Sequence, residues 1–156
     1  MNHGIIRKTI MIVFILLLCT TGLTLYAGEA RVLIANQGSE FKDAVVEKLQ
    51  DEMQESGISF TVQKLNTLGR VNQEEWDAIV IIHAVKIGSI NKNVERFFNR
   101  IDDYSKVIVC TTCGEKDVVP ETYGVDSITA ASKKEEVSAL TQQIEKRLHT
   151  IIQHCQ

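Results

Sequence analysis

Residues 31–41 read RVLIANQGSEF, an apolar run followed by a turn that contains Gly38 and Ser39. The run from Arg31 to Ala35 is typical of a strand that is buried on both faces. An amphipathic helix is predicted over Phe41–Glu55, because apolar residues recur there at every fourth position. A strand-to-helix turn offers free N–H groups and the positive end of a helix dipole, which together favour a phosphate group. The stretch therefore predicts an α/β domain with a candidate phosphate loop.

Four more apolar runs predict the other strands of the sheet. Ile58–Leu65 alternates in part between apolar and polar residues, which indicates an edge strand with one wet face. Ala78–Ala84 is the most apolar run of the domain and is expected to be the central strand. Lys106–Thr112 predicts a fourth strand, and Ser127–Ala131 predicts a weak fifth.

Helical spacing of apolar residues predicts helices over Asn91–Ile101 and from Val137 to Ile151, whereas residues 66–77 predict a brief helix or none. Because strands alternate with helices, we expect a doubly wound parallel sheet of four to five strands in a three-layer α/β/α arrangement. Ligands bind such sheets at the carboxyl ends of the strands. The loops at 36–40, 83–90 and 111–119 are expected to meet there.

Residues 1–27 predict a signal peptide or an N-terminal membrane anchor. Arg7 and Lys8 precede an apolar core, and Leu25-Tyr-Ala27 is a plausible cleavage site. The segment is uncharged from Thr9 to Ala27, long enough to cross a bilayer if it is not cleaved. A lipoprotein signal at Cys19 is a third reading, disfavoured because bulky Leu18 precedes the cysteine. In each case residues 28–156 form one domain that is exported, periplasmic or extracytoplasmic.

The charge balance argues against a nucleic-acid partner. The chain has 17 Lys and Arg against 20 Asp and Glu, and loss of residues 1–27 would remove two of the basic ones. Nucleic-acid binding depends on neutralising phosphates with basic side chains, which this composition does not favour. We expect contact with a membrane only through the N-terminal segment.

Cys110-Thr-Thr-Cys113 is a second chemical feature, at the end of the predicted fourth strand. In an exported domain the pair could form a structural disulfide, remain as buried thiols or act as a redox dithiol. A zinc site would need further ligands, and His154 and Cys155 are the extra donors, far along the chain. The spacing alone leaves these alternatives open.

Three stretches resemble the flavodoxin-like superfamily: VLIANQGS at 32–39, WDAIVIIHAVKIG at 76–88 and VERFF at 94–98. The short flavodoxin domain of menaquinone-dependent protoporphyrinogen oxidases is the nearest form, and the resemblance extends from about residue 31 to 112. It implies a protein that binds FMN for electron transfer or oxidoreduction, and with the N-terminal segment this protein is expected to be exported or membrane-anchored. A redox partner protein or a quinone is the partner that it implies.

The resemblance places the FMN phosphate at the first loop and the isoalloxazine ring between the second and third loops. It identifies no catalytic residue and no metal ligand. The cofactor-binding residues that it implies are Asn36, Gln37, Gly38, Ser39 and Glu40 at the phosphate, His83, Ala84, Val85, Lys86 and Gly88 beside the ring, and Cys110, Thr111, Thr112, Cys113 and Gly114 on its other side.

The first loop departs from the family pattern, since Ser39 is its only hydroxyl and Glu40 stands where a threonine is expected. A carboxylate beside a phosphate is repulsive by ~1 kcal/mol even when well solvated. Alternatively, Glu40 occupies the first turn of the helix and satisfies its free N–H groups. A second hypothesis is therefore a cofactor-free binding or scaffold domain with a degenerate phosphate loop. A thiol oxidoreductase that uses Cys110 and Cys113 is a third, and His83 is either a proton donor or a side chain hydrogen-bonded to a neighbouring loop.

Overall fold

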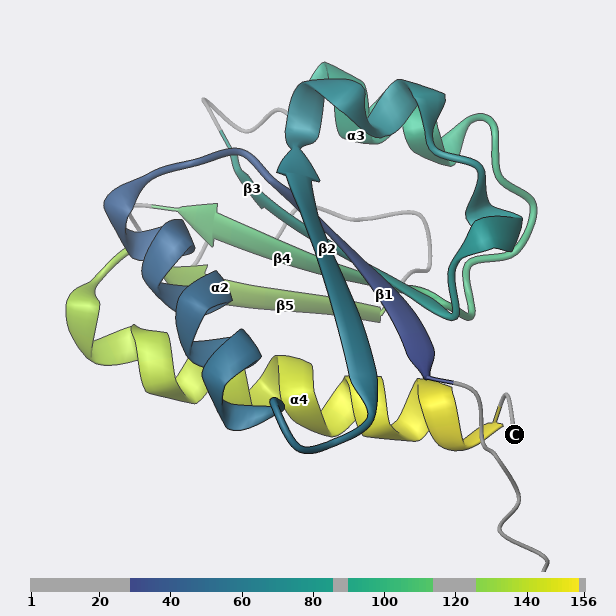
Figure 1. Ribbon diagram of the computed structural model, residues 1–156. Helices are drawn as coiled ribbons and strands as arrows, with labels where there is room; N and C mark the ends of the chain where they lie inside the picture. Colours follow the sequence, from purple (N-terminus) through teal and green to yellow (C-terminus); the bar gives the residue numbers. More distant parts are fainter. Residues whose placement is uncertain (1–28, 86–89, 114–125, 155–156) are drawn as a thin grey trace, which may run out of the picture.

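A computed structural model describes residues 29–85, 90–113 and 126–154 of the chain (Figure 1). The predicted leader and the site residues Lys86, Gly88 and Gly114 lie outside these ranges. The described part contains one sheet of five parallel strands in the order β2-β1-β3-β4-β5. The strands are β1 (Ala30–Asn36), β2 (Ile58–Lys64), β3 (Ala78–Ala84), β4 (Val107–Cys113) and β5 (Asp126–Ala131).

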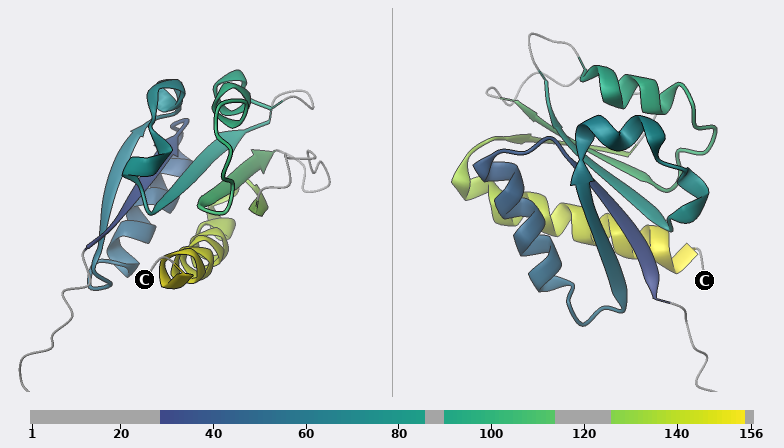
Figure 2. Two further views of the ribbon diagram at one scale, coloured as in Figure 1. Left: turned by 90° about the vertical axis from the view of Figure 1, so that its right-hand side faces the viewer. Right: turned by 45° about the horizontal axis from the view of Figure 1, so that its top comes forward.

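Helices cover both faces of the sheet, as Figure 2 shows. On one face lie α2 (Glu40–Glu52) and α4 (Val137–His154), and on the other lie α3 (Lys92–Phe98) and a short 3-10 helix, Leu65–Arg70. Shorter 3-10 turns occupy Gln73–Glu75 and Lys134–Glu136. The predicted three-layer, doubly wound α/β class is confirmed. None of the helices in the described ranges is long and apolar enough to cross a bilayer.

The two cores explain why the central strand has no polar alternation. In β3, Val80 and Ile82 pack in the core under α2 and α4, whereas Ile79 and Ile81 pack in the core under α3. All four side chains are fully buried. Each buried side chain of this size stabilises the fold by about 1.5–3 kcal/mol. β3 therefore occupies the centre of the sheet, as its sequence predicts.

The strand order creates a crevice at the carboxyl edge of the sheet. β1 pairs with β2 on one side and with β3 on the other, so the connections that leave β1 and β3 run in opposite directions. A sheet of this type binds ligands at such a topological switch point. The register places Asn36 opposite Ile82, which brings the first loop against the end of β3.

α2 ends three residues earlier than its sequence pattern predicts. Residues 53–57 form turns, and the Ser56 hydroxyl donates to the carbonyl of Met53 at 2.5 Å. Gly57 then adopts a φ of +70°, a conformation that glycine adopts without a steric penalty. This turn directs the chain into β2 at the edge of the sheet.

Candidate functional site

The first loop forms a turn that leaves backbone N–H groups exposed at the start of α2. Gly38 has a φ of +80°, and Ser39 is the N-cap residue of the helix. The Ser39 Oγ accepts a hydrogen bond from the backbone N–H of Lys42 at 3.4 Å. Within the described ranges, the amides of Ser39, Glu40 and Phe41 have no hydrogen-bond acceptor. These three donors lie at the positive end of the helix dipole, where an anion is stabilised.

Lys42 lies buried at the same end of the helix. Its side chain is 5% exposed, and its Nζ donates to Ser39 Oγ at 3.1 Å. It forms no ion pair with any carboxylate that the structure describes. Burial lowers the pKa of the ammonium, although the nearby carboxylate of Asp43 raises it in part. The sequence did not identify this residue, because a lysine in an amphipathic helix is expected on the solvent face.

His83 lies fully buried near the end of β3, and β4 holds it in place. Its Nε2 is 3.1 Å from the Thr111 hydroxyl, and the Thr112 hydroxyl donates to its carbonyl at 3.2 Å. Burial lowers the pKa of His83 to about 4; the backbone of Ala84 opposes this shift, and the charge of Lys42 adds to it. The imidazole is therefore neutral at pH 7 and hydrogen-bonded to a neighbouring strand rather than to a loop. Among the described residues, its Nδ1 has no hydrogen-bond partner.

Two residues predicted to surround a phosphate instead bind the protein with their side chains. The Gln37 Oε1 accepts from the backbone N–H of Ala84 at 2.7 Å, which ties the first loop to β3. The Asn36 Oδ1 accepts from the N–H of Gly38 at 3.0 Å, and its Nδ2 donates to Asp43 at 2.7 Å. These bonds fix the shape of the loop, so the hydrogen-bond donors that stay unpaired there among the described residues are the backbone amides of residues 39–41.

Glu40 is the first residue of α2, in the first helical turn. Its side chain is exposed and forms no hydrogen bond with the described residues. It therefore complements the helix dipole without capping the free amides.

Cys110 and Cys113 lie on the same extended strand, which keeps their side chains apart. Both are buried thiols within β4. Residues three apart on a strand have Cα atoms about 10 Å apart and point to opposite faces, whereas a disulfide needs Cα atoms within about 7 Å. The hypothesis of a redox disulfide between these two cysteines is therefore wrong for this fold. No cluster of His, Cys, Asp and Glu that could hold a metal occurs in the described part of the chain.

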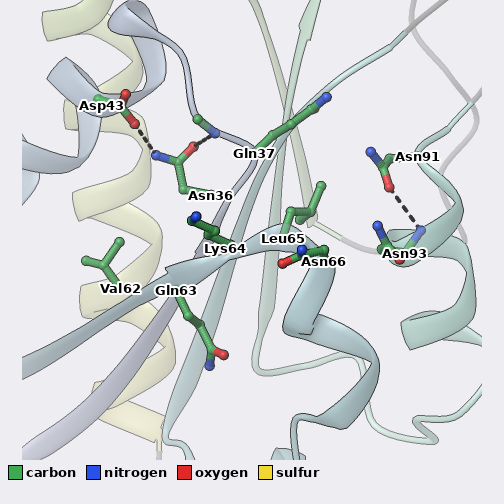
Figure 3. Close-up of a pocket in the computed structure, with 11 residues that line it drawn as sticks. Asn36, Gln37, Asp43, Val62, Gln63, Lys64, Leu65, Asn66, Asn91 and Asn93 are labelled. Carbon is green, nitrogen blue, oxygen red and sulfur yellow. Dashed lines mark hydrogen bonds between the residues drawn. The ribbon is translucent and has the colours of Figure 1, made fainter.

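A cleft of about 660 Å³ opens beside the first loop, between the ends of β1 and β2 and the start of α3 (Figure 3). Of the predicted site residues it contains Asn36, Gln37 and Gly38. Sequence reasoning missed the others, although polar residues at the end of the edge strand and the Asn-x-Asn pattern after the second loop were available signals. The missed residues are Asp43, Val62, Gln63, Lys64, Leu65, Asn66, Asn91 and Asn93.

Comparison with solved structures supports the fold. An oxidoreductase from Corynebacterium diphtheriae superimposes with a TM-score of 0.50 at 14% sequence identity, covering 81% of this chain and 98% of that chain. An orphan response regulator of H. pylori gives a TM-score of 0.42 at 18% identity, over 78% of this chain and 98% of that chain. No protein-family model and no curated protein matches the sequence. The first similarity supports a flavodoxin-like fold and, at this identity, bears on the fold alone.

Proposed function

We propose that this protein binds FMN at the carboxyl edge of its sheet, with the phosphate at the start of α2, and that it acts in electron transfer or oxidoreduction. The observation that carries the proposal is the buried ammonium of Lys42 beside the N-cap residue Ser39. The resemblance to protoporphyrinogen oxidases remains a prediction within this proposal.

A phosphate dianion fits the donors found at this end of the helix. The amides of Ser39, Glu40 and Phe41 supply three N–H groups, and the Lys42 ammonium supplies a positive charge. Burying a charged group without an ionic partner is unfavourable, and a bound anion would supply that partner. The Lys42 charge also opposes the repulsion that exposed Glu40 exerts on a phosphate. These features favour phosphate binding despite the missing hydroxyls.

The protein supplies binding and orientation in such a complex, and the flavin supplies the one- and two-electron chemistry. The bond from Ala84 to Gln37 holds the first loop against β3 and keeps the helix N–H groups in place. His83 contributes a neutral imidazole near neutral pH, because its pKa is about 4. It is fully buried and is not among the residues that line the cleft, so the proposal gives it no role as a source of protons. The contacts predicted for Val85, Thr111 and Thr112 with the ring remain part of the proposal.

The proposal also includes the location of the protein and its redox partner. With residues 1–27 as a signal peptide or anchor, the flavoprotein would act outside the cytoplasm, and a redox partner protein or a quinone would exchange electrons with it. N-terminal sequencing of the purified protein distinguishes a cleaved signal from a retained anchor.

A flavin titration tests the proposal. We expect FMN fluorescence to be quenched saturably at micromolar concentrations, and we expect riboflavin, which lacks the phosphate, to bind at least tenfold more weakly. Inorganic phosphate at millimolar concentration should compete with FMN. Absence of saturable FMN binding at these concentrations would refute the proposal.

The hydrogen bonds of Asn36 and Gln37 favour one alternative, a cofactor-free binding or scaffold domain. Both side chains are already bound within the protein, so the loop is ordered without a ligand. In that case the ultraviolet and visible spectra of the purified protein would show no flavin, and neither FMN nor phosphate would raise its melting temperature.

A further inference from the structure

β2 is an edge strand whose outer side has no partner in the described part of the chain. It lies at one end of the sheet order, and Figure 2 shows no described helix or strand beyond it. The backbone N–H of Ala30 donates to the carbonyl of Gly57 at 3.1 Å, and Ala30 is in register with Ile58. In a parallel ladder this pairing directs the backbone groups of the odd-numbered residues of β2 to β1. The N–H and C=O groups of Ile58, Phe60 and Val62 therefore point outward.

This edge lacks the features that keep edge strands from pairing with other chains. From residue 58 to residue 63 it has no charged residue, no proline and no glycine. Its pairing with β1 is continuous over all seven residues of the strand, so no bulge twists the edge away. An unprotected edge of this length is a template for a further strand.

The outward-pointing residues also form an apolar row on one face of β2, because alternate residues of a strand share a face. Ile58 and Phe60 are partly buried and pack against the core under α2 and α4. Val62 is 44% exposed and is the one exposed large hydrophobic residue of the described chain. A strand that paired with this edge would extend the apolar face and cover Val62.

A second copy of the chain matches this edge when the two β2 strands pair antiparallel around a two-fold axis. Residues whose N–H and C=O groups point outward form the hydrogen-bonded pairs of such a ladder. With Phe60 opposite Phe60 of the second copy, Ile58 lies opposite Val62 and all the outward groups from 58 to 62 gain a partner. Aromatic and aliphatic pairs of this kind stabilise antiparallel strands.

The same register brings opposite charges together at both ends of the ladder. Lys64 lies two residues beyond Val62, so it reaches past Ile58 of the second copy to the turn at 53–57, which carries Glu55. Both charged side chains are exposed, and neither forms an ion pair with a described residue of its own chain. Parallel pairing would instead place Lys64 beside Lys64, which is unfavourable.

We propose that this protein forms a two-fold dimer through antiparallel pairing of β2, which joins two five-stranded sheets into one continuous sheet. The occupant of the edge is a second copy of the chain, because the apolar row and the contact of Lys64 with Glu55 are self-complementary. A contact along one strand is smaller than the standard interface of about 1,200–2,000 Å². We therefore expect a reversible dimer that is half associated at about 10–100 µM. The inference does not depend on FMN binding.

Sedimentation equilibrium of the purified full-length protein without FMN measures the dimer. Val62→Lys places a charge in the apolar row at an exposed position and should raise the dissociation constant at least tenfold. Gln143→Lys, at an exposed position of α4, is the control and should change it by less than about twofold. The pair of variants also separates this contact from association through residues 1–27. A monomer at about 500 µM, or a dimer that Val62→Lys leaves intact, overturns the proposal.

Charge reversal tests the register of the two strands. Lys64→Glu and Glu55→Lys each put like charges together at both ends of the ladder, so each should weaken the dimer about five- to tenfold. The double variant restores opposite charges and should return to within about threefold of the wild-type dissociation constant. A double variant that recovers none of the lost affinity overturns the antiparallel pairing.

Amide hydrogen exchange identifies the strand that forms the contact. The amides of Phe60 and Val62 should exchange more slowly at about 200 µM than at about 2 µM protein, whereas the amide of Thr61, which points to β1, should not change. If the chain stays monomeric and these amides are protected only by an added extended peptide of another sequence, the edge binds a different chain and the proposal is overturned. FMN binding by a monomeric chain would overturn the dimer and leave the proposed function standing.

Discussion

Replacing Lys42 by methionine should weaken ligand binding and stabilise the ligand-free protein. Methionine keeps the unbranched stem and removes the charge, in a side chain that is 5% exposed. A hydrogen bond to a charged group contributes about 1.5–3 kcal/mol. The loss corresponds to an FMN dissociation constant that is roughly 10- to 150-fold higher.

The effect on the ligand-free fold has the opposite sign. Burial lowers the pKa of Lys42 below its ordinary 10.5, so the folded state disfavours the charged form that the unfolded chain keeps. Lys42→Met removes this cost, and we expect the free energy of unfolding to rise by about 1 kcal/mol at pH 7. The wild-type protein should gain stability as the pH rises from the lowered pKa toward 10.5. The methionine variant should lack this gain.

Urea denaturation with and without FMN measures both effects on the same samples. Lys48→Met is the control, because Lys48 lies on the same helix, is partly exposed and pairs with Glu52 at 2.9 Å. It should change stability and affinity by less than about 0.5 kcal/mol. The reasoning is wrong if Lys42→Met destabilises the free protein by 1 kcal/mol or more and leaves FMN affinity unchanged, because the lysine would then be a structural residue.

Three further predictions concern protonation, loop charge and the thiols. Because the folded pKa of His83 is about 4 and its ordinary value is 6.5, the wild-type protein should lose up to about 3 kcal/mol of stability as the pH falls through this window. His83→Gln should lack that part of the loss, and an unchanged pH profile would contradict the assignment. Glu40→Gln should tighten FMN binding about two- to fivefold at low salt, whereas Glu47→Gln on the exposed face of α2 should not; equal effects would exclude a local charge repulsion. Cys110 and Cys113 should resist alkylation until the protein unfolds, and peptide mapping of the oxidised native protein should find no bond between them.

The sequence predicted the strands well, because a strand that is buried on both faces is recognised as a continuous apolar run. Ala78–Ala84 was expected as the central strand, and β3 has these bounds. The edge position of residues 58–64 and the weak fifth strand were also confirmed. The fourth strand was predicted to end at Thr112, whereas β4 includes Cys113. That extra residue bears on whether Cys110 and Cys113 can form a disulfide, because it places both cysteines on one extended strand.

The cleft could not be predicted, because its residues come from segments that only the strand order brings together. Lys64 ends the edge strand and Asn91 begins α3, and neither is near Gln37 in sequence. Local patterns identify a polar strand end or a helix cap, and both are ordinary surface features. The order β2-β1-β3 places the three segments around one hollow.

Lys42 is the most informative failure of sequence reasoning. Helical periodicity assigns it to solvent, yet the first turn of α2 directs it to the carboxyl edge of the sheet, close enough to His83 to lower its pKa. A scaffold gains nothing from a buried lysine that forms no ion pair with a described residue, and an apolar side chain would serve it better. Departures from local folding rules concentrate at functional sites, where a ligand compensates for their cost. Two measurements on Lys42→Met therefore distinguish the flavoprotein from the scaffold domain: its free energy of unfolding without ligand and its FMN affinity. In a flavoprotein the variant gains stability and loses FMN affinity. In a scaffold domain it gains stability and loses no function.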